Sequence, residues 1–124
     1  MVNELCGWIF VLSGLAMGLV MGVKFQREDW LGGYASLPRR MVRLAHVALV
    51  ALGILNIQFA ESAARVNLNP SLLSIASFAF MAAAVLMPAC CLWMAATRRH
   101  FEIFAAPVAC LAAGLILTIG GLLQ

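Results

Sequence analysis

The sequence is short of charged residues. Only 10% of its 124 residues are Asp, Glu, Lys or Arg, against roughly 25% in an average soluble domain. Hydrophobic residues make up 65% of the chain, and a soluble protein this apolar would expose surfaces large enough to aggregate. A lipid bilayer is the solvent that suits this composition, and the length allows one domain.

Motifs for catalysis and for metal or phosphate binding are also missing. There is no Ser/His/Asp set, no glycine-rich phosphate loop and no paired carboxylate site, so we expect no catalytic activity from the isolated chain. No basic run is interleaved with aromatic residues, which argues against nucleic-acid binding. The four cysteines show neither CxxC nor a Cys/His zinc pattern, so we expect buried thiols and no metal site. They are Cys6, Cys90, Cys91 and Cys110.

Four apolar segments are present, each long enough to cross a bilayer, whose hydrocarbon core of about 30 Å needs about 20 helical residues. They cover residues 5–23, 41–60, 71–96 and 101–123. A helix is the form in which such a segment satisfies its own backbone hydrogen bonds in lipid. We therefore predict an all-α integral membrane protein whose whole chain forms a single four-helix transmembrane bundle.

Basic residues are distributed unequally between the connections. Of the eight Lys and Arg residues, all but Arg65 occupy or flank the connections at residues 24–40 and 97–100. Basic connections favour the cytoplasmic side of a membrane. The pattern predicts a multi-pass protein of the cell membrane, with residues 24–40 and 97–100 in the cytoplasm and both termini on the other side.

Glycines recur along the first predicted helix. Gly14, Gly18 and Gly22 are spaced four residues apart, and Gly7 lies seven residues before them. This spacing places a strip of bare backbone on one face, where another helix can approach closely. The approaching helix belongs either to this chain or to a partner subunit, and the sequence leaves both interpretations open.

The second predicted helix carries a face of small and polar residues. His46, Gly53 and Asn56 fall near one stripe at helical spacing on an otherwise aliphatic helix. Polar groups are disfavoured against lipid, so we expect this face to point into the bundle or toward a partner. Asn56 is expected to bond a neighbouring helix, and Gly53 to permit close packing.

His46 is a candidate axial ligand for haem b. It lies about one and a half turns into the second predicted helix, and Arg43, one turn earlier, would pair with a haem propionate. The stretch Arg43-Leu44-Ala45-His46 resembles the start of haem-binding helices in small membrane cytochromes. By this resemblance His46 would be one ligand and His100, expected near the same membrane face, the second. The alternative is a histidine hydrogen-bonded within the bundle.

Three functional hypotheses follow. The first is a small, non-catalytic accessory or structural subunit of a larger membrane complex, suggested by the glycine strip and the lack of an ionisable residue in mid-membrane. The second is an electron-transfer subunit that holds haem b through His46, with His100 as second ligand. The third is an oligomeric channel or transporter, built from copies of this chain and lined by the face of Asn56. The expected partners are the lipid bilayer and other membrane subunits.

Overall fold

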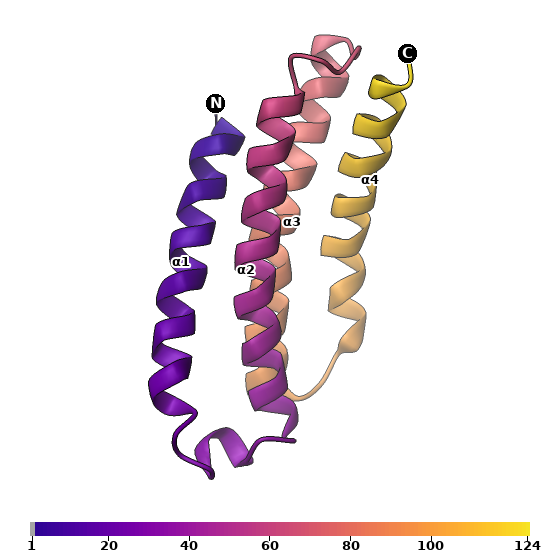
Figure 1. The fold of residues 1–124 in the computed structure, drawn as a ribbon. Helices are drawn as coiled ribbons and strands as arrows, with labels where there is room; N and C mark the ends of the chain where they lie inside the picture. The colour runs from indigo at the N-terminus through magenta and orange to yellow at the C-terminus, as the bar shows by residue number, and fades with distance from the viewer. Residues whose placement is uncertain (1) are drawn as a thin grey trace.

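The computed structural model describes residues 2–124 as an all-helical chain (Figure 1). Four long helices are joined by short connections, two of which contain a 3₁₀ turn. Their bounds are α1 Val2–Lys24, η1 Trp30–Gly32, α2 Leu37–Ser62, α3 Pro70–Thr97, η2 Phe101–Phe104 and α4 Ala105–Leu122. All four helical segments are long and apolar enough to cross a membrane, which confirms the predicted four-helix arrangement.

The helices pack in chain order and run alternately in opposite directions. α1 packs against α2, α2 against α3 and α3 against α4, so α1 and α4 form the two edges of the bundle (Figure 1). The connections that contain η1 and η2 lie at one end, which we call the connection end. The start of α1 and the C-terminus lie at the other end, the terminal end.

α2 begins at Leu37, four residues earlier than the apolar pattern suggested. Ser36 caps it, because its Oγ accepts a hydrogen bond from the Arg39 backbone N–H at 3.3 Å. Pro38 follows in the first turn, where the missing N–H would have had no helical partner. Capping chemistry, not hydropathy, therefore sets this boundary.

Capping and proline residues also set the first residues of α3 and α4. Asn69 caps α3 through its Oδ1, which accepts from the Leu72 backbone N–H at 2.9 Å. The last apolar segment divides into the 3₁₀ turn η2 and a regular helix from Ala105. Pro107 explains the division, since proline is tolerated in the first turn of an α-helix and disrupts its interior.

The core lies along the middle helices α2 and α3 and is built mainly from alanine and phenylalanine. Its two clusters of buried residues are Ala48, Leu52 and Ala84, and Phe59, Ala76 and Phe80. Leu111 of α4 packs on both clusters and so joins the edge helix to the centre. Small side chains at these positions let the helices approach one another closely.

The edge helices are mostly uncovered. Within the apolar windows of α1 and α4, 17% and 11% of the residues are buried, against 39% in α2 and in α3. Large aliphatic side chains such as Leu19 of α1 and Ile116 of α4 point outward and are 74% and 69% exposed. Both edges therefore present apolar surface that must be covered by lipid or by another apolar surface.

Gly7 and Gly53 bring the backbones of α1 and α2 into direct contact. A Cβ atom at Gly7 would lie 2.6 Å from the Gly53 carbonyl oxygen, and a Cβ at Gly53 would lie 2.8 Å from that of Gly7. Nothing larger than hydrogen fits at either position. Farther along the same contact, Gly14 faces Val50. The close approach of the two helices thus depends on glycine, because any side chain at Gly7 or Gly53 would collide with the other helix.

Gly7→Ala is expected to destabilise the bundle by about 1–3 kcal/mol, because the added methyl group would force the two backbones apart. Gly22→Ala is the matched control, since a Cβ there meets no atom within 4 Å. Alanine should leave stability unchanged or raise it by up to about 1 kcal/mol at that position. The measurement is unfolding in mild detergent, followed by helical circular dichroism. Equal stability of the two variants would contradict the close contact.

Candidate functional site

A buried side-chain amide lies near the terminal end of the bundle. Asn56 of α2 is fully buried, and its Oδ1 accepts a hydrogen bond from Nδ2 of Asn3 at 2.9 Å. Its own Nδ2 donates to the carbonyl oxygens of Leu52 at 2.9 Å and Phe80 at 3.2 Å. The amide is therefore paired at both ends in apolar surroundings, where an unpaired amide would cost several kcal/mol.

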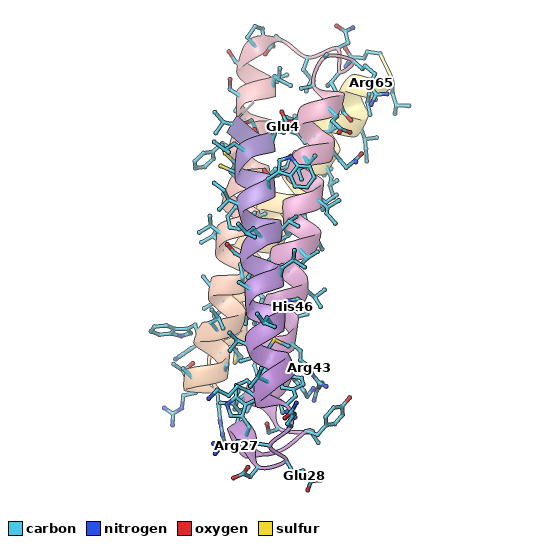
Figure 2. All side chains as sticks on the ribbon, turned by 60° about the vertical axis from the view of Figure 1, so that its left-hand side comes forward. Glu4, Arg27, Glu28, Arg43, His46 and Arg65 are labelled. Carbon is cyan, nitrogen blue, oxygen red and sulfur yellow. The ribbon has the colours of Figure 1, made fainter. Side chains whose placement is uncertain are left out.

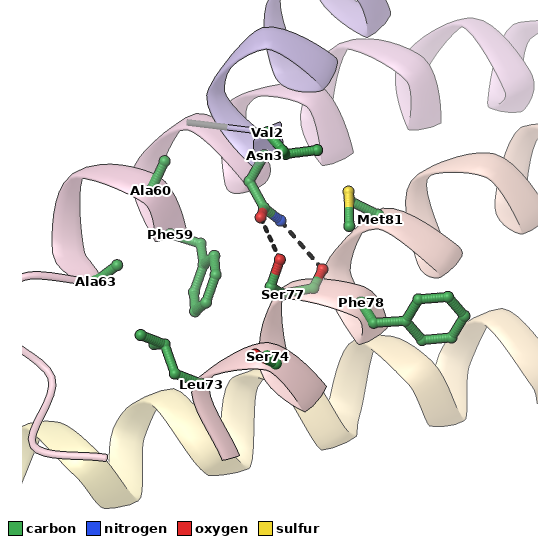
Figure 3. A pocket seen from close by; sticks show the side chains of 10 residues that line it. All are labelled: Val2, Asn3, Phe59, Ala60, Ala63, Leu73, Ser74, Ser77, Phe78 and Met81. Carbon is green, nitrogen blue, oxygen red and sulfur yellow. Dashed lines mark hydrogen bonds between the residues drawn. The ribbon is translucent and has the colours of Figure 1, made fainter. Parts of the chain in front are cut away.

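Asn3 extends this network from α1 to α3. Its Nδ2 also donates to the Ser77 carbonyl oxygen at 3.1 Å, and the Ser77 hydroxyl donates to Asn3 Oδ1 (Figure 3). Asn56 was predicted from the sequence, whereas Asn3, which bonds Asn56, and Ser77, which bonds Asn3, were not. A signal for Asn3 was present, because it precedes Gly7 by four residues and so continues the glycine strip by one turn.

A cavity of about 330 Å³ adjoins the network between α1, α2 and α3 (Figure 3). Among the described residues that line it, the polar side chains are Asn3, Ser74 and Ser77. Both hydrogens of the Asn3 amide and both serine hydroxyl hydrogens are already donated to groups of the chain itself. The described part of the cavity wall therefore offers a ligand no free side-chain donor, and the network serves to join three helices.

His46 lies in the contact between α1 and α2, nearer the connection end (Figure 2). Its Nδ1 is 2.8 Å from the Gly14 carbonyl oxygen. A carbonyl can only accept, so Nδ1 donates, and in the neutral imidazole Nε2 holds the lone pair. The ring lies over Gly18, where a Cβ would come within 2.8 Å of Cε1. Gly14 and Gly18 thus hold and orient this ring within the chain.

The other candidate haem residues have different surroundings. The guanidinium of Arg43 lies over the ring of Tyr34, with Cζ 4.6 Å from the ring centroid, so it is turned toward the connection between α1 and α2. His100 is exposed, has a left-handed φ of 69° and lies between α3 and η2. His46 therefore belongs to the α1–α2 pair of helices and His100 to the α3–α4 pair.

The glycine strip of α1 is used within the chain over most of its length. Gly7 and Gly14 are buried against α2, and Gly18 is covered by the imidazole of His46. At Gly22 a Cβ would meet nothing within 4 Å, and the same holds for Gly120 of α4. Bare backbone therefore reaches the outer surface on both edge helices.

Arg39 is a further buried polar residue that the sequence analysis did not distinguish from its neighbours. Its side chain is 3% exposed, and Nη2 donates to the Phe25 carbonyl oxygen at 3.0 Å. Nη1 donates to the carbonyl oxygens of Glu28 at 3.2 Å and Arg27 at 3.5 Å. The guanidinium also lies 4.4 Å from the centroid of the Phe25 ring. Arg39 thus connects the first turn of α2 to the segment that follows α1.

Comparisons with known proteins add no relative. No family model, no curated protein and no solved structure matches this chain. What the chain does is therefore argued from its own residues and their geometry.

Asn56→Ala and Asn3→Ala are each expected to cost about 1–3 kcal/mol, because each leaves buried partners without a hydrogen bond. Because the two amides bond each other, the double variant should lose about 1 kcal/mol less than the sum of the two. Gln58→Ala is the control, an exposed amide on the same helix with no hydrogen bond to any described residue, expected within about 0.5 kcal/mol of the parent. Unfolding in detergent measures all four, and strictly additive losses would mean that the amides do not interact.

Proposed function

We propose that this chain is a multi-pass membrane protein that acts as a non-catalytic subunit of a larger membrane assembly. The observation that carries the proposal is the apolar, largely uncovered outer surface of the edge helices α1 and α4. A bilayer removes such surface from water along the length of a helix, and a partner helix can cover what lipid does not.

The placement of charge supports a location in the bilayer. In Figure 2, Arg27, Glu28 and Arg43 lie toward the connection end, whereas Glu4 and Arg65 lie toward the terminal end. The long middle of the bundle carries mainly apolar side chains, and the amides of Asn3 and Asn56 are turned inward and paired. This is the distribution expected when the middle faces hydrocarbon and the ends face head groups and water.

The open glycines support a subunit that packs against other helices. Gly22 and Gly120 expose bare backbone on the outer surfaces of α1 and α4. In membranes, small residues let a second helix approach closely and gain van der Waals contact that lipid tails do not match. The buried face of α4 is also narrow, with Pro107, Gly114 and Gly121 spaced at seven residues. Most of its circumference is available to a partner.

The lone pair on Nε2 of His46 supports a second candidate function, the ligation of haem b. A histidine ligand typically donates its other ring N–H to a carbonyl or carboxylate, which fixes the tautomer and the direction of the ring. His46 has this arrangement through Gly14. The channel hypothesis gains no such support, because Asn56 is 0% exposed and so faces no surface at which copies of the chain would meet.

The proposed orientation places residues 24–40 and 97–100 in the cytoplasm. In a variant without the native cysteines, Tyr34→Cys should react only with a thiol reagent added from the cytoplasmic side. The connection between α2 and α3 lies at the terminal end (Figure 1), and Asn67→Cys at an exposed position within it should react only from the opposite side. A membrane-impermeant maleimide applied before and after permeabilisation makes the measurement. Reversed labelling would overturn the orientation, and release of the protein by alkaline extraction would overturn the membrane location.

Purification in mild detergent, with partners retained, tests the subunit proposal. We expect a colourless chain that migrates with other polypeptides in constant ratio, and Gly22→Leu or Gly120→Leu should weaken this association without unfolding the bundle. A chain that migrates alone would contradict the proposal. The visible spectrum of the same preparation tests the second candidate. A Soret band lost in His46→Ala would establish haem ligation, whereas a band unchanged in that variant would rule out His46.

A further inference from the structure

Arg39 carries a buried positive charge that has no counter-charge among residues 2–124. Its hydrogen-bond partners are three backbone carbonyl oxygens, which bear partial charges, and no carboxylate of the described residues forms an ion pair with it. Its Nε is buried and has no hydrogen-bond partner. A buried cation without a paired anion is costly, so an anion bound beside Arg39 would lower the free energy of this end of the bundle.

A cavity of about 450 Å³ lies beside this side chain. Arg39, Phe25, Tyr34 and Glu28 line it. The Arg39 guanidinium faces both rings, with Cζ 4.4 Å from the centroid of Phe25 and 5.8 Å from that of Tyr34. A water molecule occupies about 30 Å³ of liquid, so the cavity has room for a phosphate group and part of its substituents.

The segment around the cavity is basic. The Cζ atom of Arg43 lies 4.6 Å from the centroid of the Tyr34 ring, which brings a second guanidinium beside a ring that lines the cavity. The stretch from residue 24 to residue 43 holds five cationic residues and two acidic ones. They are Lys24, Arg27, Arg39, Arg40 and Arg43, and Glu28 and Asp29. The start of α2 lies here too, and a helix N-terminus adds positive potential.

We propose that this cavity binds the phosphate of an anionic phospholipid head group. The inference rests on the proposed membrane location and names lipid as one partner of the chain. Arg39 supplies the buried charge, and Arg43 supplies a second charge on the Tyr34 ring, next to the cavity. Hydrogen bonds from a guanidinium to phosphate are among the stronger ones in proteins, because both groups are charged.

The position of the cavity selects lipid as the source of the phosphate. It lies where α1 ends and α2 begins, at the border of two apolar segments, which is the depth of lipid phosphates in a bilayer. Trp30 packs on Phe25 with ring centroids 5.4 Å apart, and Tyr34 is 70% exposed. Tryptophan and tyrosine are enriched at this interface.

Among the described residues that line the cavity, Glu28 is the acidic one, and it tests whether the site prefers negative charge. Its side chain is exposed and forms no ion pair with any described residue. A carboxylate near a bound phosphate weakens binding by repulsion. Removing its charge should therefore strengthen the site, whereas removing a nearby positive charge should weaken it.

The experiment titrates the purified full chain, in a neutral detergent, with a phosphatidylglycerol and a phosphatidylcholine of equal chain length. Native mass spectrometry counts the bound lipid. Phosphatidylglycerol should bind more tightly. Arg43→Gln should weaken its binding about fivefold, which corresponds to about 1 kcal/mol. Glu28→Gln should strengthen it by up to the same factor. Glu28 is exposed and Arg43 is half-buried, and neither side chain forms a hydrogen bond with a described residue, so the fold should tolerate these changes.

Arg99→Gln is the control, because it removes the same charge at the same end of the bundle but from the other connection. It should change binding less than about twofold, the effect of a distant, screened charge. If Arg99→Gln and Arg43→Gln weakened phosphatidylglycerol binding equally, the binding would reflect the overall positive charge of the chain. That result would overturn the site. Equal binding of the two lipids would also overturn it.

Inorganic phosphate distinguishes the two sources of a phosphate group. At millimolar concentration it should leave the bound phosphatidylglycerol in place, and complete displacement would assign the cavity to free phosphate and overturn the lipid proposal. These outcomes are separate from alkaline extraction and cysteine labelling. A chain that remains in the membrane but shows no lipid preference keeps the proposed function and loses only this site.

Discussion

The direct contact between the backbones at Gly7 and Gly53 is the constraint on which the α1–α2 half of the bundle depends. With the helices this close, the short side chain of Asn3, one turn before Gly7, reaches Asn56, which lies nearly one turn after Gly53. Toward the other end, the same proximity lets His46 bond a carbonyl of α1. Polar side chains can form hydrogen bonds between these helices because Gly7 and Gly53 have no side chain and the two backbones come into contact.

The interior and the outer surface of the bundle therefore have different roles. Inside, short polar side chains form hydrogen bonds with one another and with backbone carbonyl oxygens of α3, and these bonds hold α1, α2 and α3 together. Outside, the edge helices offer apolar surface and open glycines. At the connection end, Arg39 and its neighbours concentrate positive charge beside a cavity. Stability thus comes from the interior, whereas the two edges and the connection end are the surfaces at which we propose that partners bind.

The sequence predicted the helices well because hydropathy is a local property, and it located Asn56 because an amide is disfavoured against lipid. Its partner Asn3 could not be deduced, since the pairing spans 53 residues and depends on the register between α1 and α2. Arg39 and Arg40 are equivalent in sequence, yet one is buried and the other exposed. Arg39 is the one that meets backbone carbonyl oxygens of the preceding connection, and hydropathy carries no information about that contact.

The long sequence separations of the Asn3 bonds also bear on the order of assembly. Asn3 is held by Asn56 and Ser77, which follow it by 53 and 74 residues. At about 5–20 residues per second, a ribosome needs roughly 4–15 s after Asn3 to reach Ser77. During that interval the first helix exists without the groups that fix its N-terminal turn. Asn3 lies in the first turn of α1, so this turn is synthesised before its hydrogen-bond partners and is among the last parts of the bundle to reach its final place.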